Sequence, residues 1–593
     1  MARQSGGAIV GDVLRNHGVP FLFTLCGGHI SPILIEAKAR GIRVVDVRDE
    51  KHAVFAADAV ARMTGIPGVA AVTAGPGVTN TVTAVKNAQM AQSPVILLGG
   101  AAATILKGRG ALQDIDQLTL MRPITKWATT VKSLANLAPT LDRAFEEATS
   151  GVPGPVFVEL PIDLLYDEDV VRDWYAKESG VKDADGFGAR MLKLYLEGHL
   201  YRQFRAPHLP LDLPKKGLHL PSVSEIAAHL PPPSRDVDGQ IREVAERLAQ
   251  AKRPVLVVGS QALVNCREPH RIADAVRRLG VPTYLGGMAR GLLGRRSEQQ
   301  LRHARGKALK DADLVIIAGF PFDFRLGYGR SIGRKATLVS VNLSATDLRK
   351  NRRPDVPVKM HPGEFIVQLS QGLAGKGDWA EWFGTLQGRE NARDEEIARQ
   401  GQEQDRLINP IQFFLRLEEK LADDAVLVVD GGDFVATGSY IVRPRAPLSW
   451  LDPGVFGTLG VGGGFAVGAA LCRPKSEVWL LYGDGSSAYS LSEFDTFARH
   501  GLAPIAVIGN DGSWAQIARE QVEMFGDDVG TVLRRTDYQK VAEGYGGEGL
   551  LLDDPARIDE TLDRAKDLSR SGRPVCINVH IARSEFRKGS ISV

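Results

Sequence analysis

Two apolar runs in the C-terminal third of the chain each end in residues that can hold a cation or a phosphate. Residues 478–482 are typical of a buried parallel strand, and Gly483-Asp484-Gly485 follows directly. Residues 505–508 form a second such run, which ends at Asn510, and the spacing leaves room for one helix between the two strands. Neighbouring parallel strands would therefore place a carboxylate beside an amide oxygen. Hard oxygen ligands of this kind bind Mg2+ or Ca2+ together with diphosphate oxygens.

A surface Asp-Gly turn is the alternative interpretation of Gly483-Asp484-Gly485 taken alone. The second strand end at Asn510 favours a ligand site, because two suitable oxygen ligands then meet at one edge of a sheet. Ser486 and Ser487 are expected to cap a helix over residues 491–500, whose N-terminus would attract an anion.

The N-terminal third shows the same arrangement of apolar runs that lead into glycine or charge. Residues 21–25 lead into Cys26-Gly27-Gly28-His29, residues 44–47 into Arg48-Asp49-Glu50, and residues 69–72 into Gly75-Pro76-Gly77 and Asn80. In open parallel sheets, ligands bind at such strand ends. For Glu50 taken alone, an acid that stabilises a helix N-terminus is the simpler interpretation, and for His29 a structural role is equally consistent.

The elements that would position these residues follow from the alternation of apolar and amphipathic segments. Strands that alternate with helices predict βαβ units and doubly wound parallel sheets, and a chain of 593 residues is too long for one core. We therefore expect an α/β fold with three such domains. The predicted boundaries are an N-terminal domain at 1–175, a connecting insert at 176–237, a middle domain at 238–375, a linker at 376–405 and a C-terminal domain at 406–593.

The insert and the linker differ in composition from the three domains. The insert is rich in proline and has one aromatic-rich helical segment at 189–204, so a connection packed on the surface is the preferred interpretation and a lid or partner surface the alternative. The linker is charged and is expected to contain a helix. The glycine-rich stretch 460–472 is too short to span a bilayer, and it predicts a tightly packed buried helix.

The bulk composition excludes several classes of protein. With 44% hydrophobic and 24% charged residues and a formal net charge of +3, the chain lacks the basic excess of nucleic-acid-binding proteins. Its four scattered cysteines form neither a metal-binding spacing nor a disulfide framework, which suits a reducing compartment, and the N-terminus has no apolar signal segment. We therefore expect a cytoplasmic protein with no nucleic-acid or membrane partner.

The motifs together resemble those of the acetolactate-synthase-like superfamily of thiamine-diphosphate (ThDP) enzymes. The residues that carry the resemblance occur in the family's order and spacing over nearly the whole chain: Glu50, Gly75-Pro76-Gly77 with Asn80, Gln113, Gly483-Asp484-Gly485 and Asn510. The resemblance implies a first domain that binds the cofactor's aminopyrimidine, a last domain that binds its diphosphate, and a middle domain free of ThDP. Because the site in this family forms between two subunits, it also implies a homodimer or homotetramer.

The resemblance assigns roles residue by residue. Glu50 would hold the pyrimidine N1′ and promote removal of the thiazolium C2 proton, and His29 and Gln113 would donate hydrogen bonds to the reacting oxygen. Leu459 would be the apolar wedge that bends the cofactor, beside Gly457. The implied ligands of Mg2+ are Asp484, Asn510 and the backbone oxygen of Gly512, and the other implied cofactor contacts are Gly75, Pro76, Asn80, Gly432, Asp433, Gly485 and Ser486.

Within the superfamily the chain most resembles the type 2 2-hydroxyacyl-CoA lyases, in residues 23–30, 85–94 and 589–593. Acetolactate synthases carry Gln-Trp-Gln shortly after the metal-binding asparagine, whereas this chain has Gln516-Ile517-Ala518 there. The resemblance implies cleavage of a 2-hydroxyacyl-CoA to formyl-CoA and an aldehyde one carbon shorter, or the reverse condensation. A 2-keto-acid carboligase or decarboxylase of the acetolactate synthase type is the alternative. The resemblance leaves open whether the middle domain binds ADP, FAD or nothing. It also suggests that the tail at 587–593 closes the site.

Overall fold

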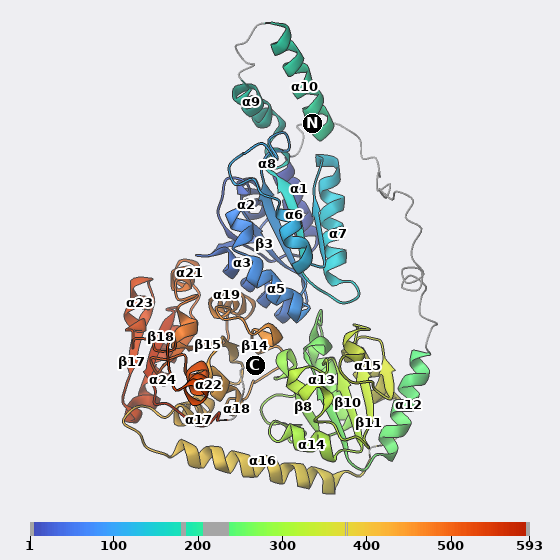
Figure 1. The fold of residues 1–593 in the computed structure, drawn as a ribbon, viewed down its shortest axis with the longest axis vertical. Coiled ribbons are helices and arrows are strands. Elements are labelled where there is room, and N and C mark those ends of the chain that lie inside the picture. The colour runs from blue at the N-terminus through green and yellow to red at the C-terminus, as the bar shows by residue number, and fades with distance from the viewer. Residues whose placement is uncertain (1–4, 180–185, 205–235, 374, 376, 589–593) are drawn as a thin grey trace.

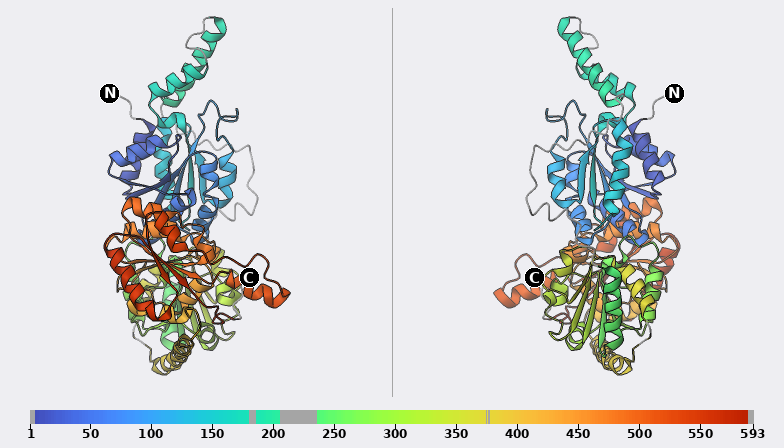
Figure 2. Two further views of the ribbon diagram at one scale, coloured as in Figure 1. Left: turned by 90° about the vertical axis from the view of Figure 1, so that its left-hand side faces the viewer. Right: turned by 90° about the vertical axis from the view of Figure 1, so that its right-hand side faces the viewer.

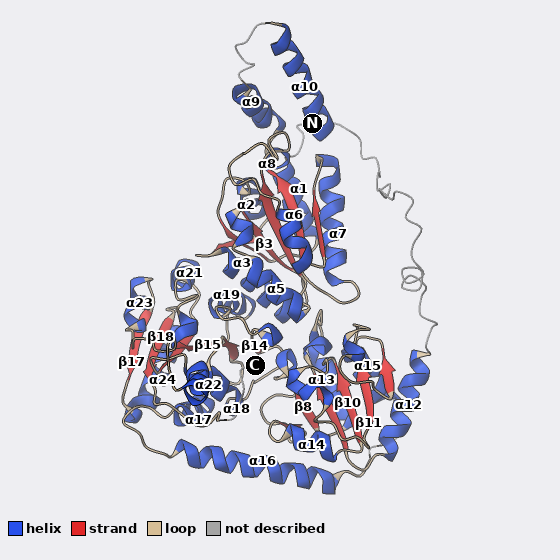
Figure 3. Cartoon of the chain, in the orientation of Figure 1, coloured by secondary structure: helices blue, strands red, loops and turns tan. Residues whose placement is uncertain are grey.

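The structure is a computed structural model that describes residues 5–179, 186–204, 236–373, 375 and 377–588. Within them the chain forms three parallel sheets of six strands each, and helices cover the sheet faces (Figures 1 and 3). The α/β fold with three doubly wound sheets that the sequence predicts is therefore confirmed. Among the residues described, no helix combines the length and apolarity needed to cross a membrane.

The N-terminal sheet has the strand order β2-β1-β3-β4-β6-β5. Its order reverses between β1 and β3, where a crevice for a ligand opens in sheets of this kind. The strands are β1 (Phe21–Leu25), β2 (Arg43–Asp46), β3 (Gly68–Val72), β4 (Val95–Ala101), β5 (Trp127–Thr130) and β6 (Val156–Pro161). The helices are α1 (Gly6–Asn16), α2 (Ser31–Ala39), α3 (Glu50–Thr64), α4 (Pro76–Thr79), α5 (Val82–Ala91), α6 (Gln117–Met121), α7 (Leu137–Thr149) and α8 (Ile162–Leu165).

The middle sheet has the order β12-β11-β10-β7-β8-β9, which reverses between β7 and β10. Its central strands are continuous apolar runs because both faces are covered. The strands are β7 (Pro254–Val258), β8 (Thr283–Leu285), β9 (Gln300–Leu301), β10 (Leu314–Ala318), β11 (Thr337–Val341) and β12 (Val356–Val358). The helices are α12 (Val237–Gln250), α13 (Pro269–Leu279), α14 (Arg305–Asp311) and α15 (Pro362–Gly372).

The C-terminal sheet has the order β14-β13-β15-β16-β18-β17 and reverses between β13 and β15. The strands are β13 (Val426–Val429), β14 (Trp450–Leu451), β15 (Val478–Gly483), β16 (Ile505–Asn510), β17 (Glu548–Leu552) and β18 (Val575–His580). The helices are α17 (Pro410–Lys420), α18 (Asp433–Ile441), α19 (Gly462–Cys472), α20 (Asp484–Ser487), α21 (Glu493–His500), α22 (Ala515–Phe525), α23 (Tyr538–Gly544) and α24 (Ile558–Arg570). The long helix α16 (Ala380–Gly401) lies in the predicted linker and joins this sheet to the middle one (Figure 1).

Helices α3 and α19 pack the N-terminal and C-terminal sheets together. Gly464 and Gly468 of α19 permit the close approach, because an added Cβ at Gly468 would lie 2.7 Å from the Ala56 carbonyl oxygen of α3. The rings of Phe55 and Phe465 meet edge to face, with their centroids 5.8 Å apart. The buried helix predicted at 460–472 is thus confirmed as α19, and it fixes the position of α3, whose first residue is Glu50.

The end of the predicted N-terminal domain and the first part of the predicted insert contribute the two helices of a hairpin, α9 (Glu168–Glu178) and α10 (Phe187–Phe204). Figure 2 shows this hairpin projecting from the end of the N-terminal unit. The helix predicted at 189–204 is confirmed as α10, and its buried side chains pack on α9 and on Ala103. The proline-rich part of the insert at 205–235 and the tail residues 589–593 lie outside the described residues.

Candidate functional site

Asp484 and Asn510 come together because β15 and β16 are neighbouring strands, with Gly483 paired to Gly509. Both side chains are buried. One oxygen of Asp484 accepts the Gly512 N–H at 2.8 Å and the Ser513 N–H at 3.3 Å. The carboxylate therefore fastens the loop that follows Asn510 to the end of β15.

The Asn510 side chain is oriented by its nitrogen, which leaves its oxygen free for a ligand. Its Nδ2 donates to the Thr536 carbonyl and to Asn578 Oδ1, each at 3.1 Å. Its Oδ1 is buried and has no hydrogen-bond partner among the described residues. An orphaned amide oxygen beside a carboxylate fits a hard divalent cation. The predicted Mg2+ ligands Asp484 and Asn510 are thus compatible with the ion.

The third predicted ligand, the Gly512 carbonyl, already accepts a hydrogen bond from the Leu533 N–H at 2.8 Å. A carbonyl oxygen has two lone pairs, so one remains for a cation. Gly512 has φ +70°, which lets the loop turn back at this point.

Carboxylates gather around this strand edge. Burial, together with the negative charge of the neighbouring Asp484, raises the pKa of Asp511 to about 7. Burial also raises the pKa of Asp484. Asp433, at the start of α18, is paired with Arg519 at 2.6 Å, and its other oxygen is buried with no hydrogen-bond partner in the part of the chain that the structure describes. Such a concentration of negative charge is stabilised by a bound cation.

A cavity of about 330 Å³ opens at the point where the order of the C-terminal sheet reverses. Two positions that line or border the cavity have no room for a side chain. An added Cβ at Gly431 would lie 2.2 Å from Leu459, and one at Gly485 would lie 2.5 Å from the Trp514 ring. The predicted cofactor contacts that line the cavity are Gly432, Asp433, Gly457, Leu459, Gly485 and Ser486, together with Asp484. The cradle therefore fits a diphosphate, which backbone N–H groups can bind.

One prediction near this cavity is wrong. Ser486 and Ser487 do not cap the helix that follows them, because they form a separate turn, α20, and α21 begins only at Glu493 after Ser492. The Ser486 hydroxyl instead accepts the Gly483 N–H at 3.1 Å and donates to the Gly431 carbonyl at 3.0 Å. It therefore ties the ends of β13 and β15 together.

The strip that carries Gly457 and Leu459 is held by Asp430, a residue that sequence reasoning missed. Its two oxygens accept the N–H groups of Gly460 at 2.9 Å and Gly462 at 2.7 Å. Burial raises the pKa of Asp430 to about 7. Its place at the end of a strand was the available signal.

Glu50 begins α3 at the edge of the N-terminal sheet, and its buried carboxylate accepts a hydrogen bond from Asn80 Nδ2 at 3.0 Å. Gly77 lies against it, since an added Cβ there would be 3.6 Å from Glu50 Oε1 and 2.8 Å from Thr73. The structure therefore brings Glu50, the Gly75-Pro76-Gly77 turn and Asn80 together.

His29 and Gln113 lie on the same edge. His29 Nδ1 is 3.1 Å from Thr73 Oγ1, and burial lowers the pKa of the imidazole, so the neutral ring is favoured. An added Cβ at Gly75 would lie 2.7 Å from the Gln113 carbonyl oxygen, which places Gln113 directly on the glycine turn. Gln113 has φ +62°, an unusual value for a side chain other than glycine.

The glycine turn is held by hydrogen bonds to the side chain of Gln117, a second residue that sequence reasoning missed. Its Oε1 accepts the Gly75 N–H at 2.8 Å, and its Nε2 donates to the Gly100 carbonyl at 3.1 Å and to Glu159 at 3.0 Å. Glu159 is fully buried and also accepts from Lys107 and Thr130. Neither residue belongs to a recognisable motif, so the sequence contains no signal for them.

Among the described residues, the side chains around Glu50 do not line the cavity beside Asp484 of the same chain. The cavity beside Asp484 is lined, among the described residues, by side chains between Gly431 and Ile517, and Glu50 is not one of them. Two residues after Glu50, α3 contacts helix α21 of the same chain: His52 Nδ1 lies 2.7 Å from Glu493 Oε1.

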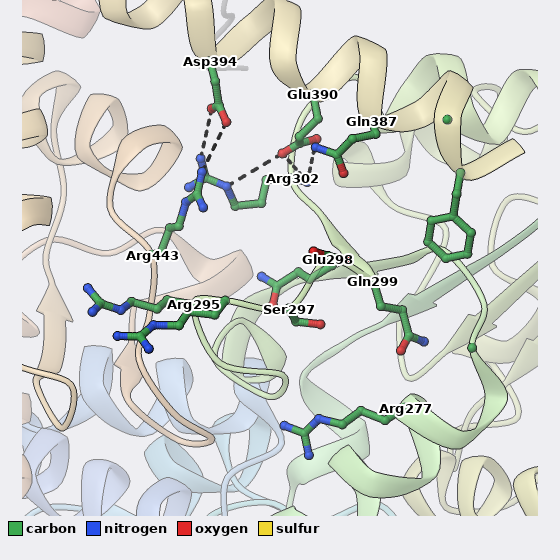
Figure 4. A pocket seen from close by; sticks show the side chains of 15 residues that line it. Arg277, Arg295, Ser297, Glu298, Gln299, Arg302, Gln387, Glu390, Asp394 and Arg443 are labelled. Carbon is green, nitrogen blue, oxygen red and sulfur yellow. Dashed lines mark hydrogen bonds and ion pairs between the residues drawn. The ribbon is translucent and has the colours of Figure 1, made fainter. Parts of the chain in front are cut away.

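Two further cavities lie around the middle sheet. One, of about 270 Å³, is at the point where its strand order reverses, and its lining includes Ser260, Gly319 and Asn342. The other, of about 870 Å³, lies between α13, α16 and Arg443 (Figure 4). Each arginine that lines it forms an ion pair with a carboxylate, for example Arg443 with Asp394 at 3.2 Å, and we assign it no ligand.

Three family models match the chain. They are described as the N-terminal TPP binding domain, the central domain and the C-terminal TPP binding domain of thiamine pyrophosphate enzymes, and they match residues 4–120, 241–369 and 430–579.

Curated relatives match over the full length. A 2-hydroxyacyl-CoA lyase 2 from Danio rerio is 48% identical and one from Homo sapiens 47% identical; the matches cover 100% of this chain and 94% and 92% of those proteins. The acetolactate synthase large subunit IlvG from Mycobacterium tuberculosis is 33% identical, over 97% of this chain and 95% of that protein.

Proposed function

Because this chain belongs to the thiamine pyrophosphate enzyme family, we propose that it is a ThDP- and Mg2+-dependent 2-hydroxyacyl-CoA lyase. The reaction is cleavage of a 2-hydroxyacyl-CoA to formyl-CoA and an aldehyde one carbon shorter, and its reverse joins formyl-CoA to an aldehyde or ketone. The observation that carries the proposal is full-length similarity to proteins named 2-hydroxyacyl-CoA lyase 2, at higher identity than to the acetolactate synthase.

Bound ThDP supplies a carbon nucleophile at its thiazolium C2. In our proposal the C-terminal sheet holds its diphosphate through Mg2+, with Asp484, Asn510 and the Gly512 carbonyl as ligands. Gly432, Gly485 and Ser486 lie against the diphosphate. Because the Asp433 side chain is engaged with Arg519, Asp433 contributes through the backbone at the start of α18.

Glu50 is the proposed proton carrier at the pyrimidine N1′. Its carboxylate is buried, so water does not compete with the ring nitrogen for the proton that the two groups share. Asn80 fixes one carboxylate oxygen, while Gly75 and Pro76 shape the wall beside it. His29 and Gln113 donate hydrogen bonds to the substrate oxygen that gains negative charge. Leu459 and Gly457 support the bent cofactor from the other side.

We propose that a complete site is built from two copies of the chain, which is supported by the absence of Glu50 from the described lining of the cavity beside Asp484 of its own chain. We propose a homodimer, or a homotetramer built from two such pairs, in which each site combines one N-terminal sheet with the C-terminal sheet of the other copy. For the middle sheet, the cavity lined by Ser260, Gly319 and Asn342 supports ADP as its ligand.

Turnover of a 2-hydroxyacyl-CoA by the purified protein loaded with ThDP and Mg2+ tests the proposal. We expect formyl-CoA release, and CO2 release from pyruvate instead would favour the acetolactate synthase type. Glu50→Gln keeps an acceptor for Asn80 but removes the titratable oxygen, so turnover should fall at least a thousandfold. ThDP affinity should change little.

Glu36→Gln is the matched control, because Glu36 pairs with Arg40 on α2 away from this edge. Its turnover should equal that of the unchanged protein. Full turnover by Glu50→Gln would refute the role given to Glu50.

A further inference from the structure

The α9–α10 hairpin is bonded to the segment that carries Gln113. This segment, residues 104–116, leaves the end of β4 and runs to the start of α6. Thr104, near its beginning, has its hydroxyl 2.8 Å from His199 Nε2 of α10 and also accepts a hydrogen bond from Gln203 Nε2. The insert therefore reaches the edge of the sheet on which the proposed substrate donors lie.

A buried carboxylate joins the hairpin and the segment. Asp163 of α8 is fully buried and accepts hydrogen bonds from the Thr104 N–H at 3.1 Å and the Thr104 hydroxyl at 2.6 Å. It also accepts from Tyr175 of α9 at 2.5 Å and from Gln203 of α10 at 2.6 Å. A buried carboxylate depends on such donors, so removing one of them weakens the whole cluster.

Tyr166, which lies between α8 and α9, contacts the loop of His29. The Tyr166 hydroxyl donates to the Gly28 carbonyl at 3.0 Å, and the Tyr166 ring packs edge to face on Trp174 of α9, with centroids 4.7 Å apart. Both loops that carry proposed substrate donors are thus in contact with the hairpin or with the residue that leads into it.

Between Lys107 and Gln117 most residues of the segment are exposed. Beyond Thr104 it is next fastened at Lys107, which bonds Glu159 at 2.5 Å, and then at Gln117. Gly108 and Gly110 between them have φ values of +75° and +82°, and Leu112 is 82% exposed. The position of Gln113 therefore depends on how firmly the ends of the segment are held.

We propose that the α9–α10 hairpin is a clamp that positions the Gln113 segment, through Thr104 and Asp163, for the substrate. The role of Gln113 in this statement rests on the proposed lyase function. The clamp itself does not, because it is a property of the bonds between hairpin and segment. Residues of the hairpin are positioning residues, since they act on the substrate through Thr104 and Gln113.

Two variants test the clamp, one with a substitution in the hairpin and one with a substitution in the segment. Gln203→Leu removes the α10 donor, and the amide oxygen that it also removes is buried without a partner. Thr104→Val removes the hydroxyl on the segment and keeps its backbone N–H. Glu197→Gln is the matched control on α10, because Glu197 pairs with Arg172 of α9 on the exposed side of the hairpin.

Amide hydrogen exchange of the full chain, measured without substrate, tests whether the hairpin holds residues 104–116 in place. In Gln203→Leu and Thr104→Val the amides of Leu106, Lys107 and Arg109, which are hydrogen-bonded within the segment, should exchange about fivefold faster or more. In Glu197→Gln they should exchange as in the unchanged protein. Unchanged exchange in both clamp variants, or an equal increase in Glu197→Gln, would overturn the proposal.

Steady-state kinetics of the same variants provide a second test of the clamp. With the holoenzyme, kcat/KM for a 2-hydroxyacyl-CoA should fall about tenfold or more in both clamp variants while ThDP affinity is kept. A fall in ThDP affinity of the same size would contradict a role in substrate positioning. Absence of lyase activity in the unchanged protein would refute the proposed function alone, and hydrogen exchange would still decide whether the clamp exists.

Discussion

Gln117→Leu tests whether the side-chain amide of Gln117 holds the glycine turn beside Glu50 in place. Leucine has nearly the volume of glutamine, so the substitution removes the amide without opening a large cavity. Three groups lose a hydrogen bond: the Gly75 N–H, the Gly100 carbonyl and Glu159 Oε1. Since Gln117 is only 1% exposed, water does not readily replace the lost amide.

The magnitude follows from the number of groups left without a partner. Each buried hydrogen bond contributes about 1 kcal/mol, and a buried group left unsatisfied costs about 1–3 kcal/mol. The Gly75 N–H bears most of this cost, because Glu159 keeps Lys107 and Thr130 as donors on its other oxygen. We therefore expect the free energy of unfolding of the N-terminal unit to fall by about 2–4 kcal/mol, which lowers its unfolding midpoint by roughly 5–12 °C.

Differential scanning calorimetry of the variant measures this shift. Thr119→Val on the same helix is the control, because the Thr119 hydroxyl bonds only the exposed Asp116, and its loss should cost less than about 1 kcal/mol. The kcat/KM of Gln117→Leu should also fall, because Gln113 lies directly on Gly75. A midpoint within about 1 °C of the unchanged protein would refute the assignment of Gln117 as the support of the turn.

Two more predictions concern the C-terminal sheet and its contact with α3. Gly468→Ala should destabilise the protein by about 1–3 kcal/mol, since the added Cβ would meet the Ala56 carbonyl at 2.7 Å; Gly384→Ala on α16, with nothing within 4 Å, should instead stabilise it by about 0.5–1 kcal/mol. Equal midpoints for the two variants would contradict the close α3–α19 packing. Asp430 has its pKa raised from 3.8 to about 7 by burial, so the folded state binds the proton more tightly than the unfolded state. Its contribution to stability is full below about pH 4 and is lost as the pH rises to about 7. The unfolding midpoint of the unchanged protein relative to Asp430→Asn should therefore fall between about pH 4 and about pH 7, and a difference independent of pH would argue against the raised pKa.

Strands and their ends could be predicted from the sequence because buried parallel strands are continuous apolar runs. The runs at 21–25, 314–318 and 337–341 match β1, β10 and β11 at both ends. Asp484 and Asn510 could be predicted as a pair for the same reason: each follows such a run, and neighbouring parallel strands end at one edge.

Buried polar networks could not be predicted in this way. Gln117, Glu159 and Asp163 have no periodic or motif context that separates them from solvated residues, and their partners are up to 59 residues away in the chain. The same limit applies to the insert, whose attachment to residues 104–116 the sequence does not predict. Its anchoring depends on Gln203, whose burial follows from tertiary packing alone.

The packing of α3 bears on how a complete site can form. Glu50 is the first residue of α3, and α3 is locked onto α19 of the same chain by Gly464, Gly468 and the buried pair of His52 and Glu493. Carrying Glu50 into the cavity beside Asp484 of its own chain would break this packing and leave a buried carboxylate without its histidine, at a cost of several kcal/mol. A second copy of the chain can present its own α3 edge to the cavity without such a cost. Rigid association of α3 with α19 within each chain therefore favours a site shared between two chains over one closed by domain movement.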